Sequence, residues 1–389
     1  MFSARTNWKL DSNPLSEALA KRRKSGQPVL DLTASNPTTS GFTYRAAATL
    51  RALSNPAALL YDPDPRGLSA ARRAVADYYA SHQVEVDIDA IVLTTGTSEA
   101  YSFVFRTLCN PGDEILIPEP SYPLFAFLAE IQDVKLVPYP LIYDHGWQID
   151  FHTQEGAITD RTRAVIVVHP NNPTGHLVKP REIATLNQIC AGRGLAIIAD
   201  EVFLDFALTA DRPSSFAANR EALTFTTSGI SKICGLPQMK AAWLITTGPE
   251  EIRARALERL EVIADTYLSM NAPVQHALAT FLDHRQEFQT QVTTRVLKNL
   301  SELDRQLALQ KSCARLEVEA GWYAVLRIPA TRSDEDFALL LLDSHGVYTH
   351  PGHYYDFPAD GFLVVSLITP EEDFAEGIKL LLAMFADQR

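Results

Sequence analysis

Hydrophobic residues between positions 90 and 250 form short continuous runs rather than alternating with polar ones. Continuous runs are typical of strands that are covered on both faces of a parallel sheet, and segments with a helical pattern separate them here. The predicted strands are AIVLTT (90–95), EILIP (114–118), AVIVVH (164–169), LAIIAD (195–200), ALTFTT (222–227) and AAWLITT (241–247). Strands that alternate with helices predict an α/β protein with a doubly wound, mostly parallel sheet.

The pattern changes outside this region. Residues 249–310 read as helical, and residues 312–389 mix short strands with helices, which predicts a smaller α+β domain. The first 45 residues are Pro-rich and irregular in pattern, and we expect them to dock onto that smaller domain. A chain of 389 residues exceeds one small core. We therefore predict a large domain over residues 46–285 and a small domain made of residues 1–45 and 286–389.

Composition narrows the class of protein. Hydrophobic residues make up 46% of the chain and charged residues 21%, as in ordinary globular enzymes. The net charge of −12 gives no basic footprint for nucleic acid, and the cluster KRRK (21–24) is interpreted as the solvated end of a short helix. No apolar run reaches signal-peptide or membrane-spanning length, and the four cysteines are dispersed. These features predict a reduced, cytoplasmic protein without a membrane or nucleic-acid partner and without a metal site.

One lysine stands in unusual surroundings. In TSGISKICGLPQMK (227–240), Lys232 lies between Ile230 and Ile233, and glycines and a proline mark a turn or loop. Apolar surroundings disfavour the charged form of a lysine and lower its pKa. A free amine can form a Schiff base with a carbonyl compound. The alternative interpretation is a lysine that snorkels from a partly buried loop.

Three further motifs follow predicted strands, where ligands of doubly wound sheets bind. In TTGTSEAY (94–101), Thr97 and Ser98 open a helix whose N–H groups suit an anion, although both residue types are also ordinary helix caps. HPNNPTG (169–175) consists of turn residues. In ADEVF (199–203), Asp200 ends a buried strand and needs a cationic partner, unless it caps a helix or forms a structural ion pair.

Together these motifs contain what an aldehyde cofactor with a phosphate and a pyridinium ring requires. Lys232 offers an amine for the aldehyde, the 97–98 helix start offers N–H groups for the phosphate, and Asp200 offers a carboxylate for the ring nitrogen. Pyridoxal 5'-phosphate is the cofactor with these properties.

The same motifs, in the same order, identify a family. The chain resembles the class I/II aminotransferases, which are fold-type I pyridoxal phosphate enzymes, over nearly its whole length. The most specific motifs are NPTG (172–175), ADEV (199–202) and SGISKICGLPQMK (228–240). YDPDPRGL (61–68), PSYPLF (120–125) and VYTHPG (347–352) support them.

The resemblance implies a role for each matching residue. Lys232 would bond to the cofactor and later move a proton, Asp200 would hold the ring nitrogen, and Tyr122 would stack on the ring. The remaining cofactor-binding residues would be Asn172, Thr97, Ser98, Phe203, Ser231, Lys240 and, from a neighbouring subunit, Tyr61. A homodimer with shared active sites follows. Asn36 and Tyr354 are the candidate substrate contacts, and the amino group would pass between an amino acid or amine and a 2-oxo acid.

The sequence departs from the family pattern near the cofactor. Lys240 stands where relatives usually carry arginine, which keeps the charge but not the bidentate fork. Phe203 stands where they carry tyrosine, so we expect a raised pKa for the bond between lysine and cofactor. Gly229 stands where serine is frequent, and Ser228 or Ser231 would have to compensate.

The largest departure concerns the substrate. Relatives carry an arginine in an R-x-S strand that binds the substrate α-carboxylate, and here Val364 occupies that position. Valine cannot form a bidentate carboxylate site. Either another cation replaces the arginine or the substrate lacks a conventional α-carboxylate. The candidate replacements are Arg327, Arg66, His350 and His353, and in the loop GHYYDF (352–357) Tyr354 and Tyr355 are expected either to contact substrate or to pack as core aromatics.

The sequence leaves other functions open. A lyase or decarboxylase could use the same cofactor and fold, because fold and cofactor do not determine the reaction. A ligand-sensing module without catalysis is a third reading, although the lysine, aspartate and asparagine of the cofactor site are all present.

Overall fold

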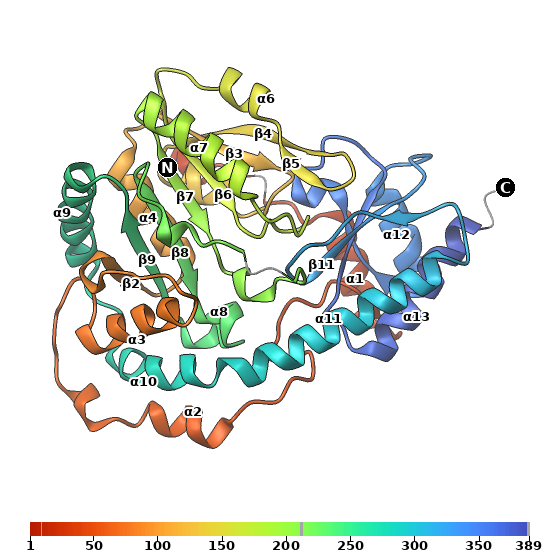
Figure 1. Cartoon of the computed structure of the whole chain (residues 1–389). Coiled ribbons are helices and arrows are strands. Elements are labelled where there is room, and N and C mark those ends of the chain that lie inside the picture. Colours follow the sequence, from red (N-terminus) through yellow and green to blue (C-terminus); the bar gives the residue numbers. More distant parts are fainter. Residues whose placement is uncertain (9, 211–212, 387–389) are drawn as a thin grey trace.

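The computed structural model describes residues 1–8, 10–210 and 213–386. Among them, eight strands form a central sheet with helices on both sides, and a smaller sheet lies beside it (Figure 1). The central order is β2-β9-β8-β7-β6-β3-β4-β5. The strands are β2 Ile91–Thr94, β3 Glu114–Glu119, β4 Lys135–Tyr143, β5 Trp147–Ile149, β6 Thr162–Val168, β7 Ala196–Asp200, β8 Thr224–Gly229 and β9 Ala242–Thr247.

The six predicted strands are confirmed, as is the mostly parallel α/β sheet. β9 is antiparallel to both of its neighbours, β5 is antiparallel to β4, and the other adjacent pairs are parallel. The sequence pattern missed β4 and β5. β4 contains Pro138 and Pro140, which lack the N–H that a strand normally donates and therefore weaken the strand signal.

Helices cover the sheet and connect its strands. Those of the central region are α2 Ala46–Ala52, α3 Ser69–Ala80, α4 Thr97–Leu108, α5 Phe125–Glu130, α6 Phe151–Gly156, α7 Pro180–Arg193, α8 Ile230–Ile233, α9 Glu250–Tyr267 and α10 Ala272–Asp283. The long helix α11 Arg285–Leu307 leads to the smaller sheet (Figure 1). Short 3-10 turns include η2 Pro56–Leu59 and η7 Gly352–Tyr355.

The smaller sheet has the order β10-β11-β14-β13. Its strands and the helices beside it are β10 Ala314–Arg315, β11 Tyr323–Arg327, β13 His350–Pro351, β14 Phe362–Ser366, α12 Asp334–His345 and α13 Glu371–Ala386. These elements have the α+β character expected for the C-terminal part. The domain limits at residues 45/46 and 285/286 stay a prediction.

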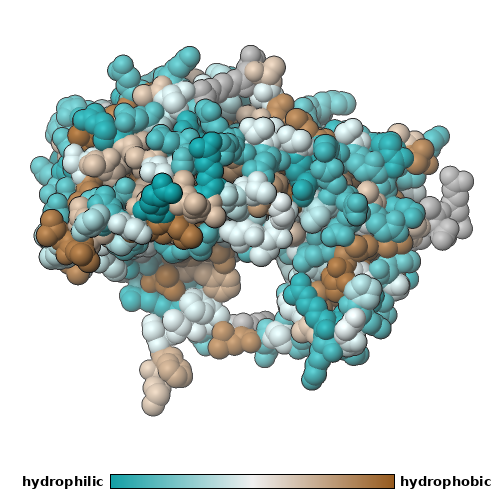
Figure 2. Space-filling model, turned by 90° about the horizontal axis from the view of Figure 1, so that it is seen from below, coloured by the Kyte–Doolittle hydropathy of each residue, from teal (hydrophilic) through white to brown (hydrophobic). Residues whose placement is uncertain are grey.

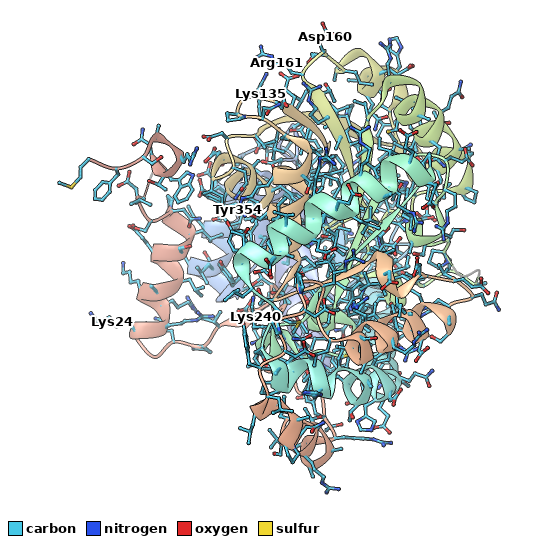
Figure 3. The ribbon with its side chains drawn as sticks, turned by 90° about the vertical axis from the view of Figure 1, so that its left-hand side faces the viewer. Lys24, Lys135, Asp160, Arg161, Lys240 and Tyr354 are labelled. Atoms are coloured by element: carbon cyan, nitrogen blue, oxygen red, sulfur yellow. The ribbon has the colours of Figure 1, made fainter. Side chains whose placement is uncertain are left out.

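The N-terminal segment is more regular than predicted. The short helix expected to end at KRRK (21–24) is α1 Pro14–Lys24, which begins with a proline behind the Asn13 cap. The irregular assignment was wrong for β1 Leu30–Asp31, which pairs with β12 Val347–Tyr348. The predicted docking is confirmed, because Leu15 and Leu19 of α1 pack with buried residues of α12. Lys24 lies at the outer edge of the molecule, as expected for the solvated end of a helix (Figure 3).

Candidate active site

The reactive lysine predicted from the sequence lies in an aromatic cage. β8 ends in the close-packed Gly229, and the short helix α8 that follows carries Lys232. The Nζ atom of Lys232 lies 5.5 Å from the ring centre of Phe203 and 5.1 Å from that of Trp322. Burial lowers the pKa of Lys232 to about 8, against the opposing charge of Asp200. With this pKa, roughly a tenth of the amine is unprotonated at pH 7.

Asp200 ends β7 as a buried carboxylate. Its oxygens accept hydrogen bonds from the Tyr101 hydroxyl at 3.0 Å and the Val202 N–H at 3.1 Å. Burial raises the pKa of Asp200 to about 6, although these hydrogen bonds and the charge of Lys232 oppose the rise. A cation bound next to Asp200 would relieve this cost. By contrast, Glu201 accepts hydrogen bonds from Ser215 and the Phe216 N–H, which is a structural role.

The loops after β6 and β3 contribute polar groups that lack internal partners. The Oδ1 atom of Asn172 and the Oγ atom of Ser121 are buried without a hydrogen-bond partner among the described residues. Such groups are costly unless a bound molecule satisfies them. Tyr122 is 39% exposed, and its pKa is raised by burial and by the nearby charge of Asp200. Asn172 and Tyr122 thus fit the ring-binding roles that the family resemblance implies.

A cationic helix start lies at the other end of the site. α4 begins at Thr97, with Ser98 next, and leaves its first N–H groups for an anion. A Cβ atom on Gly96 would lie 3.3 Å from the Nζ atom of Lys240, so this ammonium group reaches the same helix start. Lys240 has a left-handed φ of 55°, which is unusual for lysine. These groups together suit a phosphate.

Serine is absent at position 229 for a steric reason. A Cβ on Gly229 would lie 2.8 Å from the Cβ of Ala242 and 2.9 Å from the carbonyl oxygen of Ala241. Ser228 is engaged, because its hydroxyl donates to the Glu201 carbonyl at 3.3 Å. Ser231 is partly exposed on α8 and is the hydroxyl left for a ligand.

Three predicted residues make contacts that do not involve the Lys232 cage. Tyr61 is 76% exposed beyond η2. The Oδ1 atom of Asn36 accepts hydrogen bonds from the N–H and hydroxyl of Thr38 and so closes a local turn. The Tyr354 hydroxyl accepts a hydrogen bond of 2.6 Å from Asn13, on the side of α1; Figure 3 labels this tyrosine. The site roles of these three residues stay predictions.

Sequence reasoning missed two contacts of the site. Trp322 packs against Phe203 and lies over Lys232, although the two are 90 positions apart in the chain, and no local motif signals this. Tyr101 supports Asp200, and its place one helical turn after Thr97 was the available signal.

Each of the four candidate replacements for the arginine is paired, exposed or neutral. Arg66 forms an ion pair with Glu261. Arg327 is exposed, 6.0 Å from the ring centre of Phe362, and His353 is exposed on η7. Burial lowers the pKa of His350 to about 4, which keeps it neutral. Val364 itself is buried in the core.

The whole chain matches known proteins in sequence and fold. Residues 27–379 match the profile of the family described as aminotransferase class I and II. The chain therefore belongs to the class I and II aminotransferase family. It is 29% identical to the alanine aminotransferase of Mycobacterium tuberculosis over 383 residues, covering 95% of this chain and 88% of that protein. It is also 29% identical to the glutamate-pyruvate aminotransferase AlaA of Escherichia coli, covering 72% and 70%.

Solved structures agree with this assignment. An aminotransferase from Escherichia coli superimposes with a TM-score of 0.89 at 25% identity, over 100% of this chain and 98% of that chain. The alanine aminotransferase of Pyrococcus furiosus superimposes with a TM-score of 0.91 at 22% identity, over all of both chains. The chain is an aminotransferase, and enzymes of this family generally depend on pyridoxal phosphate.

Proposed function

We propose that this aminotransferase binds pyridoxal 5'-phosphate at the Lys232 cage and exchanges amino groups between a small α-amino acid and a 2-oxo acid. The observation that carries the proposal is the buried Lys232 amine in the neighbourhood of the Asp200 carboxylate. The printed names of two relatives, alanine aminotransferase and glutamate-pyruvate aminotransferase, support alanine, glutamate and their oxo acids as substrates.

The residues present fit the cofactor. Lys232 would hold it covalently, Asp200 would pair with its ring nitrogen, and the start of α4 with Lys240 would hold its phosphate. Asn172 and Tyr122 would contact its ring, and the partnerless Asn172 oxygen is the kind of group that a ligand satisfies. Bound there, pyridoxal phosphate would supply an electrophilic carbonyl carbon and an electron-withdrawing ring.

The chain itself supplies proton transfer and charge control. With a pKa of about 8, the Nζ atom of Lys232 can both accept and return a proton near neutral pH, as a base and acid at the substrate Cα. Asp200, fixed by Tyr101 and the Val202 N–H, would favour the protonated, cationic form of a ring nitrogen bound beside it. Phe203 and Trp322 exclude water from the amine, which keeps its pKa low.

We also propose a homodimer with shared sites. The segment at η2 exposes Leu59 by 90%, Leu60 by 74% and Tyr61 by 76%. With α2, it extends away from the body in Figure 1, and Figure 2, seen from that side, shows hydrophobic residues among hydrophilic ones. Large exposed apolar side chains on a projecting segment are typical of an interface.

A Tyr61→Phe variant should weaken phosphate binding in the dimer, measured as a rise in the dissociation constant of the cofactor.

The reduced state of the cysteines and the cytoplasmic location rest on the sequence alone and remain predictions. Among the described residues, no helix combines the length and apolar character that crossing a membrane requires.

A labelling experiment tests the cofactor site. The protein is loaded with pyridoxal phosphate, reduced with borohydride and digested, and mass spectrometry locates the added mass. We expect it on the peptide that contains Lys232. Lys232→Ala should lose both the label and the transfer of an amino group from L-alanine to 2-oxoglutarate. Lys24→Ala, at the exposed end of α1, is the matched control and should keep both. Labelling of another lysine in the wild type would overturn the assignment.

A further inference from the structure

Three strands of the smaller sheet place Val364 in a defined register. In β14, Val364 lies opposite Val325 of β11 and opposite His350 of β13, while Ser366 lies opposite Tyr323. Residues directly opposite each other in antiparallel strands share one face of the sheet. By the family resemblance, relatives carry an arginine on this face. Here the face carries Val364 and Val325, with His350 and Tyr323 beside them.

Two phenol groups border this face. The ring centres of Tyr323 and Tyr355 lie 6.5 Å apart, and Tyr323 lies 6.3 Å from the ring centre of Phe203. Phe203 in turn contacts the Lys232 amine. The backbone of Tyr355 is docked on the loop of Tyr122, because the Ser121 N–H donates to its carbonyl oxygen at 2.9 Å. Contacts therefore link both phenols to Phe203 and to the Tyr122 loop.

Each phenol hydroxyl has a supporting partner. The Ser35 hydroxyl is the hydrogen-bonding neighbour of the Tyr323 phenol and lowers its pKa against the effect of burial. The Nδ1 atom of His350 lies 3.1 Å from the Tyr355 hydroxyl. In the tautomer that carries its hydrogen on Nδ1, this neutral histidine donates to Tyr355. With Ser35 and His350 as donors, both phenols keep their own hydrogen to donate to a ligand.

The phenols also stay protonated. Burial raises the pKa of Tyr323 to about 12 and places that of Tyr355 well above its usual value. Each hydroxyl is therefore a neutral donor throughout the working pH range, and neither repels an anion. A carboxylate against Val364 alone would be buried without a partner, which is strongly unfavourable.

We propose that Tyr323 and Tyr355 bind the α-carboxylate of the amino acid by donating two hydrogen bonds, in the place where relatives use a guanidinium. This inference rests on the proposed function, since it assumes an α-amino acid as substrate. Tyr323 and Tyr355 would then determine specificity, and they would recognise the carboxylate by hydrogen bonds rather than by an ion pair. Two neutral donors recognise the carboxylate without cancelling its charge, so the site binds it less tightly than a bidentate arginine would.

Ligand binding to the holoenzyme tests the proposal without requiring turnover. The probes are 2-methylalanine, which has no α-hydrogen, and its amide, which has the same amine but no carboxylate. Tyr323→Phe and Tyr355→Phe should each raise the dissociation constant of 2-methylalanine about tenfold or more, the effect of one hydrogen bond to a charged group. The amide should change by less than about twofold. Tyr267→Phe, at an exposed tyrosine that ends α9, is the control and should leave both constants unchanged.

Two results would overturn the proposal. If both phenol variants weaken the acid and the amide equally, the tyrosines support the shape of the pocket rather than the carboxylate. If the wild type binds the amide more tightly and the variants alter neither constant, the Val364 face accepts an uncharged group. The proposed function is judged separately, by pyruvate formation from L-alanine. If no pyruvate forms but the dissociation constants change as predicted, alanine is rejected as the substrate and the carboxylate-binding role of the two tyrosines is still supported.

Discussion

The buried Asp200 carboxylate should make the cofactor-free protein less stable as the pH rises. Its pKa of about 6 exceeds the ordinary value of 3.8 expected in the unfolded chain, so the folded state binds this proton more tightly. The stabilisation is complete below about pH 4, is lost progressively as the pH rises through about 6, and does not change further at higher pH. The difference between the two pKa values corresponds to about 3 kcal/mol, at about 1.4 kcal/mol for each tenfold change.

The perturbation that isolates this effect is Asp200→Asn in the cofactor-free protein. With an unfolding entropy of about 2 cal/mol/K per residue, the 389-residue chain has about 0.8 kcal/mol/K. A loss of about 3 kcal/mol therefore lowers Tm by about 4 °C. Between about pH 4 and about pH 7, the Tm of the wild type should fall by about 4 °C relative to that of the variant.

Differential scanning calorimetry over this pH range gives the comparison. Asp77→Asn, on the exposed side of α3, is the control and should run parallel to the wild type. Loading the wild type with pyridoxal phosphate should remove much of its pH-dependent loss, because Asp200 would then face a cationic ring. Parallel Tm curves for the cofactor-free wild type and Asp200→Asn would refute the reasoning, since Asp200 would then titrate alike in both states.

Three other predictions concern residues where the chain departs from its relatives. Phe203→Tyr should lower the pKa of the Lys232 nitrogen when it is bonded to the cofactor, measured by titrating the visible absorbance. An unchanged pKa would contradict the role given to position 203. Lys240→Ala should weaken cofactor binding about tenfold, and more at low salt than at high salt, as measured by equilibrium dialysis. Gly229→Ala should destabilise the fold by about 1–3 kcal/mol in urea unfolding, because its Cβ would overlap Ala242. Gly192→Ala, in the open interior of α7, should instead be neutral or stabilising.

The candidate cofactor residues could be named from the sequence because each belongs to a local motif. Asp200 and Lys232 directly end or follow apolar runs that form adjacent strands, β7 and β8. Parallel neighbours bring their carboxyl ends to one edge of the sheet, so the sequence order already places these side chains together. The departures at Phe203 and Lys240 were visible for the same reason, since each lies at a set spacing from its motif.

The surroundings of Val364 could not be predicted in this way. Tyr323 and Tyr355 lie on separate segments, and only the pairing of β11 with β14 and the docking of η7 bring them together. Tyr354 and Tyr355 are adjacent in the sequence, yet one hydroxyl meets Asn13 and the other meets His350. Both residues are tyrosines, so only the backbone path of η7 decides which of the two phenols is placed toward the proposed carboxylate site.

By itself, then, the sequence determined the α/β class and the family, because continuous apolar runs and local spacing encode them. It also gave the candidate cofactor residues, and the family resemblance places Val364 where relatives carry an arginine. The tertiary structure decided what surrounds that valine, that Gly229 cannot carry a side chain, and that Trp322 closes the lysine cage. These facts depend on contacts between segments far apart in the chain, and such contacts form only when the sheets pack.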